Sequence, residues 1–221
     1  MTSGSSCRSR RIGSNSRAAC SRAAGCAATI LLAVALLVRA TVAGAEPEAF
    51  SVDREISSAE FAVRCFGVFT QHGTFRRADG MIVLDADEHS GAVDLVVETS
   101  SIDIGWSIGN AWLRSEDMFD VEHYPLMRFR SSRLVFDHSR LTEVDGALTL
   151  RGVTRPVSLK VGSMECSRDG GQEGACSASA VSRIRRSDFG LSYGLGFIAD
   201  DIDLSFRIAA SRAGTQRASR Q

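Results

Sequence analysis

Apolar and polar residues alternate along most of the chain after residue 46, with the period of two expected of half-buried β-strands. The segments 93–97, 127–130, 148–151 and 202–208 show this pattern most clearly. Short runs of Gly, Asp, Asn or Ser separate the alternating segments. About eight to ten strands can be counted, so the pattern predicts an all-β fold, an antiparallel β-barrel of about eight strands that can hold a small ligand.

One segment departs from this alternation. Its apolar residues Ile108, Trp112 and Phe119 recur at spacings near the helical repeat of about 3.6 residues or its multiples. Asn110 can cap such a helix. We therefore expect one short helical insertion near residues 108–119. In a β-barrel, an insertion of this kind closes a mouth or packs against the outside of the sheet.

The N-terminal segment is typical of a secretory signal. It carries six Arg residues and no acidic residue, and its apolar run at 27–38 has 12 residues. A membrane-spanning helix needs about 20 residues, so this run is too short to stay in a bilayer. Ala43 and Ala45 are the small residues that a signal peptidase requires before Glu46. The pair Arg10-Arg11 leaves open whether export uses the general or the twin-arginine route.

The chain therefore divides into three predicted segments: a signal peptide at 1–45, a β-barrel domain at 46–210 and a disordered tail at 211–221. The expected location of the mature protein is the periplasm or the medium outside the cell.

Removal of the signal peptide leaves three of the six cysteines, Cys65, Cys166 and Cys176. Cys166 and Cys176 flank a Gly-rich stretch, so in an oxidising compartment they are well placed to form a disulfide across a hairpin. Closing a loop of about ten residues contributes about 2.5 kcal/mol in the chain-entropy estimate. A zinc site would need further ligands, and no other His or Cys lies close in sequence. Cys65 is expected to be a buried, inert thiol.

The mature chain is acidic, which argues against nucleic acid as a partner. Without the six leader arginines, 20 basic residues stand against 26 acidic ones, a net charge of −6. The four histidines, His72, His89, His123 and His138, are scattered, and no pair has metal-ligand spacing. We therefore expect no metal site, no catalytic residue and no enzyme activity. A hydrolase or isomerase acting on a lipid inside the barrel stays as an alternative.

Four stretches of the mature chain resemble, in order and spacing, the YceI-like family of bacterial periplasmic proteins, which are described as polyisoprenoid-binding with a lipocalin-like barrel. These stretches are Phe50–Asp53 with Ser57–Val63 and Phe69–Phe75, then Trp112–Val121 with Tyr124–Ser131, then Gly146–Val157, and finally Arg186–Leu191 with Asp201–Phe206. The likeness covers about residues 50–210. Ile56 stands where the family commonly has a His, and Asn110-Ala111-Trp112 stands where it usually has Asp-x-His.

The resemblance implies a lipocalin-like antiparallel β-barrel that binds one long apolar molecule, a polyisoprenoid or an isoprenoid quinone, for carriage or storage. No cofactor is implied apart from this bound lipid. Transient contact with a membrane or a membrane protein is expected, and a homodimer stays open. The competing interpretation is a stress-related interaction module without a bound lipid, because barrels of this size can be filled by their own side chains.

Inward-facing apolar residues are the candidates for the lining of the ligand cavity. They are Phe61, Val63, Phe66, Phe75, Met81, Val97, Ile104, Trp106, Ile108, Trp112, Phe119, Met127, Phe129, Phe189 and Phe197. The aromatic residues of the helical insertion rank highest, because a segment near a mouth would meet the ligand on entry. Arg114 is expected to bridge this insertion to the barrel or to meet a polar head group, and Arg186 is expected to fix a strand crossing.

Overall fold

Eleven β-strands, one α-helix and two 3-10 turns make up the part of the chain that the structure, a computed structural model, describes: residues 47–85, 87–166 and 174–213. In chain order they are β1 (Glu48–Val52), β2 (Ser58–Cys65), β3 (Phe69–Phe75), β4 (Ala78–Asp85), β5 (Ser90–Glu98), η1 (Thr99–Ser101), β6 (Ile102–Asp103), α2 (Ser107–Arg114), β7 (Leu126–Asp137), β8 (Arg140–Leu150), β9 (Val153–Cys166), β10 (Ala175–Arg185), η2 (Arg186–Phe189) and β11 (Ile198–Arg212). The predicted signal peptide lies outside the described residues.

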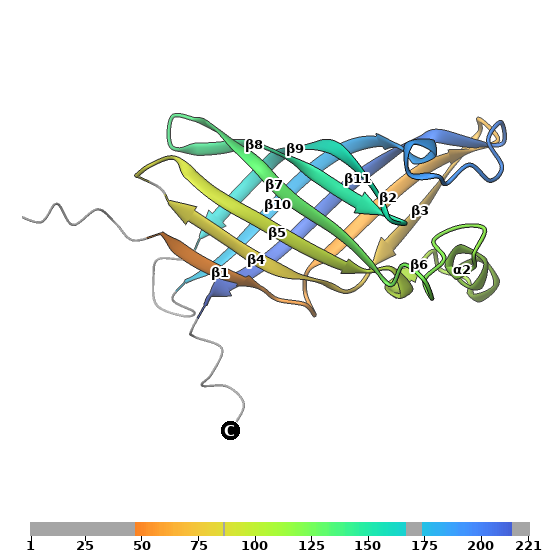
Figure 1. Cartoon of the computed structure of the whole chain (residues 1–221), viewed down its shortest axis with the longest axis horizontal. Helices are drawn as coiled ribbons and strands as arrows, with labels where there is room; N and C mark the ends of the chain where they lie inside the picture. Colours follow the sequence, from red (N-terminus) through yellow and green to blue (C-terminus); the bar gives the residue numbers. More distant parts are fainter. Residues whose placement is uncertain (1–46, 86, 167–173, 214–221) are drawn as a thin grey trace, which may run out of the picture. The chain divides into compact units, whose positions relative to one another are not determined.

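Eight strands close into a ring, in the order β1, β4, β5, β7, β8, β9, β10 and β11 (Figure 1). The ring closes because β11 returns to β1, with Val52 opposite Ala210 and Phe50 opposite Arg212. All of these pairs are antiparallel. The predicted antiparallel barrel of about eight strands is therefore confirmed.

Strands β2, β3 and β6 extend this sheet beyond the closed ring. The first part of β11 pairs with β2, whereas its last residues pair with β1. Ser57 lies at this change of partner and is buried, and its hydroxyl donates to the carbonyl of Ala209 (3.1 Å) and accepts from the N–H of Ala209 (3.0 Å). Ser57 thereby gives the N–H of Ala209 an acceptor where β1 and β2 separate, while the carbonyl of Ala209 also accepts from the N–H of Asp53.

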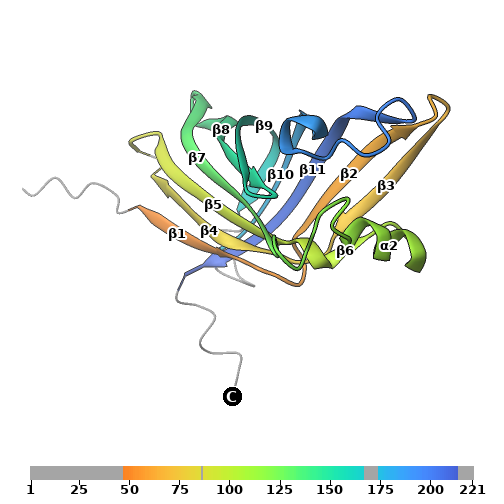
Figure 2. The same cartoon turned by 45° about the vertical axis from the view of Figure 1, so that its right-hand side comes forward.

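The predicted helical insertion is present but shorter than expected. The helix α2 ends at Arg114, and residues 115–119 form turns rather than helix. Asn110 lies inside α2, so its expected role as the cap is wrong; Trp106 is the N-cap residue and makes no side-chain cap hydrogen bond. Figure 2 shows α2 and β6 beside β3, at one end of the barrel. None of the helices in the described ranges has the length and apolar character needed to span a bilayer.

The two ends of the barrel differ in chemistry. The β4–β5 and β7–β8 turns lie at one end (Figure 1), and they carry Asp85, Asp87, Glu88 and then Asp137 with neighbouring His residues. The β2–β3 turn, α2 and the loop before β11 lie at the other end, which is called the mouth below. The mouth is the end at which the apolar loops gather.

The barrel ends later in sequence than predicted. Strand β11 extends to Arg212, two residues into the segment expected to be disordered, because residues 210–212 pair with β1. The rest of the predicted tail after residue 213 lies outside the described residues.

A disulfide joins Cys166 of β9 to Cys176 of β10, as predicted. The two residues are directly opposite each other in the ladder, with their Cα atoms 4.0 Å apart. Cys65 is free and buried, as predicted, and its inertness stays a prediction.

Replacing Cys166 by Ser is expected to lower the midpoint of thermal unfolding by about 5–10 °C in non-reducing buffer. The estimate takes about 2.5 kcal/mol for the closed loop and about 2–4 °C per kcal/mol for a domain of this size. Differential scanning calorimetry with and without reductant measures the effect. In the presence of reductant, the unfolding midpoint of the wild type should fall to the midpoint of the variant. An equal wild-type midpoint with and without reductant would contradict a stabilising role for the disulfide.

Candidate functional site

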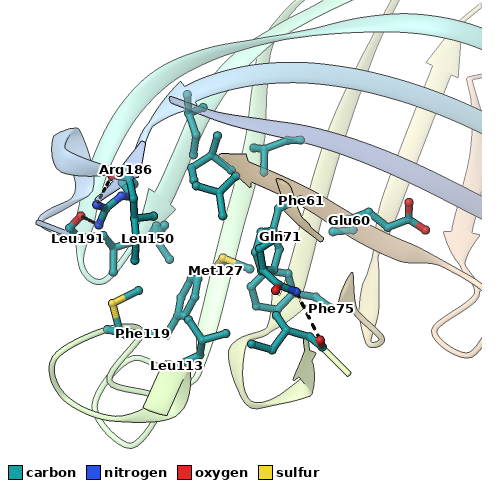
Figure 3. A pocket seen from close by; sticks show the side chains of 18 of the residues that line it. Glu60, Phe61, Gln71, Phe75, Leu113, Phe119, Met127, Leu150, Arg186 and Leu191 are labelled. Atoms are coloured by element: carbon teal, nitrogen blue, oxygen red, sulfur yellow. Dashed lines mark hydrogen bonds between the residues drawn. The ribbon is translucent and has the colours of Figure 1, made fainter. Parts of the chain in front are cut away.

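A cavity of about 530 Å³ occupies the mouth half of the barrel. Its wall is built from inward-facing side chains of β2, β3, β5, β7, β8, β9, β10 and β11, together with α2 and the loop before β11. Phe61 and Phe75 approach from one side and Phe119 and Met127 from another (Figure 3). The lining includes the exposed residue Phe66 of the β2–β3 turn, so the cavity opens at the mouth.

Twelve of the fifteen residues predicted from the sequence line this cavity. They are Phe61, Val63, Phe66, Phe75, Val97, Ile104, Trp106, Trp112, Phe119, Met127, Phe129 and Phe197. The structure shows that these residues line the cavity. That they contact a ligand stays a prediction.

The other three predicted residues lie elsewhere. Met81 faces outward on β4 and is 49% exposed, because its neighbour Ile82 takes the inward position. Residues 81–84 are all apolar, so alternation alone could not determine which of them face inward. Ile108 is on the outer side of α2 and is 74% exposed. Phe189 is packed in the core at η2 and is 2% exposed.

Sequence reasoning missed much of the opposite wall of the cavity. The overlooked lining residues of β5 and β8 to β11 are Leu95, Leu148, Leu150, Val157, Leu159, Ile184, Ile198, Ile202, Leu204 and Phe206. Most of them occupy the apolar positions of clearly alternating segments, so the period-two pattern could have identified them as inward-facing. Tyr193, in the loop before β11, also lines the cavity, and no periodicity indicates it.

The charged side chains on the cavity border direct their charged groups to partners outside the cavity. The carboxylate of Glu60 pairs with Arg207, and the guanidinium of Arg128 pairs with Asp94. The hydrogen bond from Arg128 holds the pKa of Asp94 below its ordinary value. The amide nitrogen of Gln71 donates to two backbone carbonyls, at 2.7 and 3.4 Å. The space inside is therefore bordered mainly by hydrocarbon.

Arg186 is a buried cation on the cavity wall, with 3% of its surface exposed. Its Nε donates to Ala199 (3.0 Å), its Nη1 to Leu191 (2.7 Å) and Tyr193 (2.8 Å), and its Nη2 to Ile198 (3.0 Å). All four acceptors are backbone carbonyls, and burial lowers the pKa of the guanidinium. Arg186 holds the loop before β11 in place, in agreement with its predicted structural role.

Two anchors hold α2 at the mouth, and the first is Asn110. Its amide nitrogen donates to Asp103 (2.9 Å), and its amide oxygen accepts from the N–H of Ile104 (2.8 Å). Hydrogen bonds from Asn110, Gly105 N–H and Arg76 lower the pKa of Asp103 from 3.8 to about 2. The stabilising contribution of this carboxylate is therefore fully present above pH 3.8 and is lost as the pH falls through about 2.

The second anchor of α2 is Arg114. Its Nε donates to the carbonyl of Ser100 and its Nη2 to that of Ile102, both at 2.9 Å. The predicted bridge from the helical insertion to the barrel is confirmed, and it runs through the backbone of η1 and β6.

A smaller cavity of about 80 Å³ lies deeper in the barrel, next to Phe50 and Ile82. Leu95, Leu159 and Phe206 line both cavities. These three side chains therefore stand between the two spaces.

Residues 105–109 have the Gly-x-Ser-x-Gly spacing of a hydrolase nucleophile, contrary to the expectation that the chain contains no catalytic pattern. In hydrolases such a serine is activated by a histidine. Ser107 here begins α2, and within the described ranges no hydrogen bond joins it to a histidine. Gly109 has a packing role, since a Cβ atom there would lie 2.5 Å from the Trp106 ring. Groups of three or more potential metal ligands are likewise not found in the described part of the chain.

Two curated relatives match most of this chain. UPF0312 protein plu2095 of Photorhabdus laumondii is 30% identical over 185 residues, which cover 82% of this chain and 95% of that protein. Protein YceI of Escherichia coli O157:H7 is 29% identical over 160 residues, which cover 70% of this chain and 82% of that protein.

Two solved structures share the fold. BcnA of Burkholderia cenocepacia matches with a TM-score of 0.61 at 22% identity, covering 72% of this chain and 99% of that one. A polyisoprenoid binding domain from Saccharophagus degradans matches with a TM-score of 0.58 at 17% identity, covering 75% of this chain and 99% of that one. Residues 50–210 match the YceI-like domain family. The resemblance found in the sequence is thus confirmed, and the chain belongs to the YceI-like domain family.

Proposed function

We propose that this protein is an exported, non-catalytic binding protein that holds one long apolar lipid, a polyisoprenoid or an isoprenoid quinone, in its barrel for carriage or storage. One observation carries the proposal: the cavity of about 530 Å³ is bordered mainly by hydrocarbon. Ligand pockets commonly enclose about 300–1,000 Å³. A polar group placed in this cavity would lose its hydrogen bonds to water, which favours a hydrocarbon chain as the occupant.

The energetics of such a ligand are favourable. Burial at about 0.8 kcal/mol per methylene gives roughly 4 kcal/mol for each five-carbon isoprene unit, as an upper bound. Eight units would exceed the ceiling of about 18–21 kcal/mol for non-covalent binding, so ordering of the chain and incomplete burial must offset part of the gain. Selectivity then depends on the length and width of the cavity more than on affinity for the head group.

Two further observations support the ligand class and the location. One solved structure with this fold is described as a polyisoprenoid binding domain. The sequence pattern of a signal peptide and the Cys166–Cys176 disulfide favour an oxidising compartment, the periplasm or the medium outside the cell.

Extraction of the purified protein with organic solvent tests the proposal directly. Mass spectrometry should recover an intact long-chain isoprenoid in nearly equimolar amount to the protein. The delipidated protein should then bind an added isoprenoid quinone with saturation. Both tryptophans of the chain, Trp106 and Trp112, line the cavity, so quenching of their fluorescence reports this binding.

The alternatives predict different results. A filled or vestigial cavity would give neither recovered lipid nor saturable quenching, and that outcome would refute the binding function. A lipid hydrolase or isomerase would convert the added lipid, so altered products in the extract would contradict a non-catalytic role.

A further inference from the structure

We infer that the mouth of the barrel docks onto a lipid bilayer through an apolar rim contributed by three loops. The inference rests on the proposed lipid-binding function and names a lipid bilayer as the partner of the protein. The rim consists of Phe66 and Val68 of the β2–β3 turn with Phe69 at the start of β3, Trp106 and Ile108 at the start of α2, and Tyr193, Leu195 and Phe197 of the loop before β11. Each of these large side chains is 45–84% exposed, although such residues are favourable to bury.

Contacts between the loops join part of this rim: the β2–β3 turn contacts the loop before β11, and α2 contacts the same loop through Trp112. The ring of Phe66 lies 6.0 Å from that of Phe69 and 5.8 Å from that of Phe197, centroid to centroid. The N–H of Phe66 donates to the carbonyl of Phe197. On the other side of the mouth, Trp112 of α2 contacts Tyr193, with ring centroids 5.3 Å apart.

The rim is continuous with the cavity. Five of its eight members also line the cavity, namely Phe66, Phe69, Trp106, Tyr193 and Phe197. The apolar surface thus extends from the inside of the barrel onto its outer edge. A hydrocarbon chain leaving the cavity would meet the rim first.

The loops that form the rim carry no charge. Residues 65–71, 104–113 and 189–199 contain no Asp, Glu, Lys, Arg or His, in a chain of which 24% is charged. At the opposite end of the barrel, the turns after β4 and β7 carry several acidic residues and histidines. At the mouth, the exposed charged residues Glu116, Asp117 and Glu122 lie between α2 and β7, outside the three rim loops.

Phe66, at the tip of the rim, has a backbone conformation that is unfavourable for an aromatic residue. Phe66 has φ +52°, in the left-handed region that bulky residues rarely adopt. The following Gly67, at φ +68°, completes the turn. The local conformation would be less costly with Gly or Asn at position 66, so the aromatic ring there points to a role at the surface.

The chemistry of the rim favours a bilayer over a protein partner. The three loops contain no charged residue, so the rim itself offers a protein partner no ion pair. Trp and Tyr are the residues that concentrate at membrane interfaces, and one of each is exposed here. A lipid of the proposed class resides in a bilayer, and a mouth seated in the acyl region would let its chain enter the cavity without crossing water.

Vesicle flotation with a matched pair of variants tests the inference. Val68 and Ile108 belong to the rim but do not line the cavity, so the variant V68S/I108S removes docking surface and leaves the cavity wall intact. Met81 and Val181 are exposed on the barrel wall, so M81S/V181S is the control with equal loss of apolar residues. The wild-type protein and the control should float with phosphatidylcholine vesicles, even in about 1 M NaCl, because the interaction is not electrostatic. The rim variant should bind about tenfold less of these vesicles.

Quinone titration of the same proteins separates this inference from the proposed function. In the absence of vesicles, V68S/I108S should bind the isoprenoid quinone as the wild type does. Docking is refuted if the wild type does not float with the vesicles, or if the rim variant and the control float equally. It is also refuted if size-exclusion chromatography shows a wild-type dimer that the rim variant dissociates, with no vesicle binding by either, since the rim would then join two copies of the chain. Failure of the wild type to bind quinone refutes the lipid-binding function instead, whatever the flotation shows.

Discussion

Replacing Leu204 by Trp will abolish retention of an isoprenoid lipid and leave the barrel folded. Leu204 lies on β11 and lines the cavity, and its side chain is only partly buried because the open space lies in front of it. The larger indole would occupy volume that the ligand needs. Excluding two or more methylenes from burial, at about 0.8 kcal/mol each, lowers the affinity at least about tenfold. The fold tolerates the change because the added atoms enter empty space rather than a packed core.

The adjacent residue provides the control for this prediction. Ser205 faces the opposite side of β11, where it lies across from Glu60 and Val181 in the neighbouring strands. Ser205→Trp therefore adds the same side chain outside the barrel and should bind the quinone as the wild type does. Circular dichroism of both variants verifies the fold, and fluorescence titration measures the affinity. Equal affinity of the two variants would show that the cavity is not the binding site.

The alternating pattern predicted much of the barrel, because burial on one face imposes the period of two locally. Val93, Leu95 and Val97 occupy alternate positions of one strand, and each is only 6–8% exposed, as the period of two predicts. The same rule gave no answer for residues 81–84, where every position is apolar. Closure of the ring depends on β11 meeting β1, more than 150 residues earlier, and no local pattern specifies such a contact.

The candidate site was predictable only in part, because alternation indicates which side chains face inward and not whether they fill the space. The inward residues of β7 could equally belong to a solid core, and the cavity is visible only in three dimensions. The loop residues were harder still. Tyr193 reaches the cavity through a loop without periodicity, held by contacts that Arg186 makes.

Replacing Arg186 by Leu will lower the free energy of unfolding by about 3 kcal/mol, because four backbone carbonyls in the loop and the start of β11 lose their donor at a buried position. The midpoint of thermal unfolding should fall by about 6–12 °C. Arg186→Lys should recover little of this loss, since one ammonium group cannot replace the fork of the guanidinium. Arg185→Leu is the control: Arg185 is exposed and forms a surface ion pair with Asp188, so its loss should change the stability by about 0.5 kcal/mol or less.

Arg186→Leu should also change the rate at which the bound ligand leaves the cavity. Its carbonyl partners lie in the loop and the start of β11, which border the mouth next to Tyr193 and Phe197. Without the guanidinium, this side of the mouth should open more often, and bound quinone should leave faster than from Arg185→Leu. Stopped-flow transfer of quinone to empty vesicles measures this rate. Equal release rates and equal unfolding midpoints for the two variants would show that Arg186 does not hold the mouth.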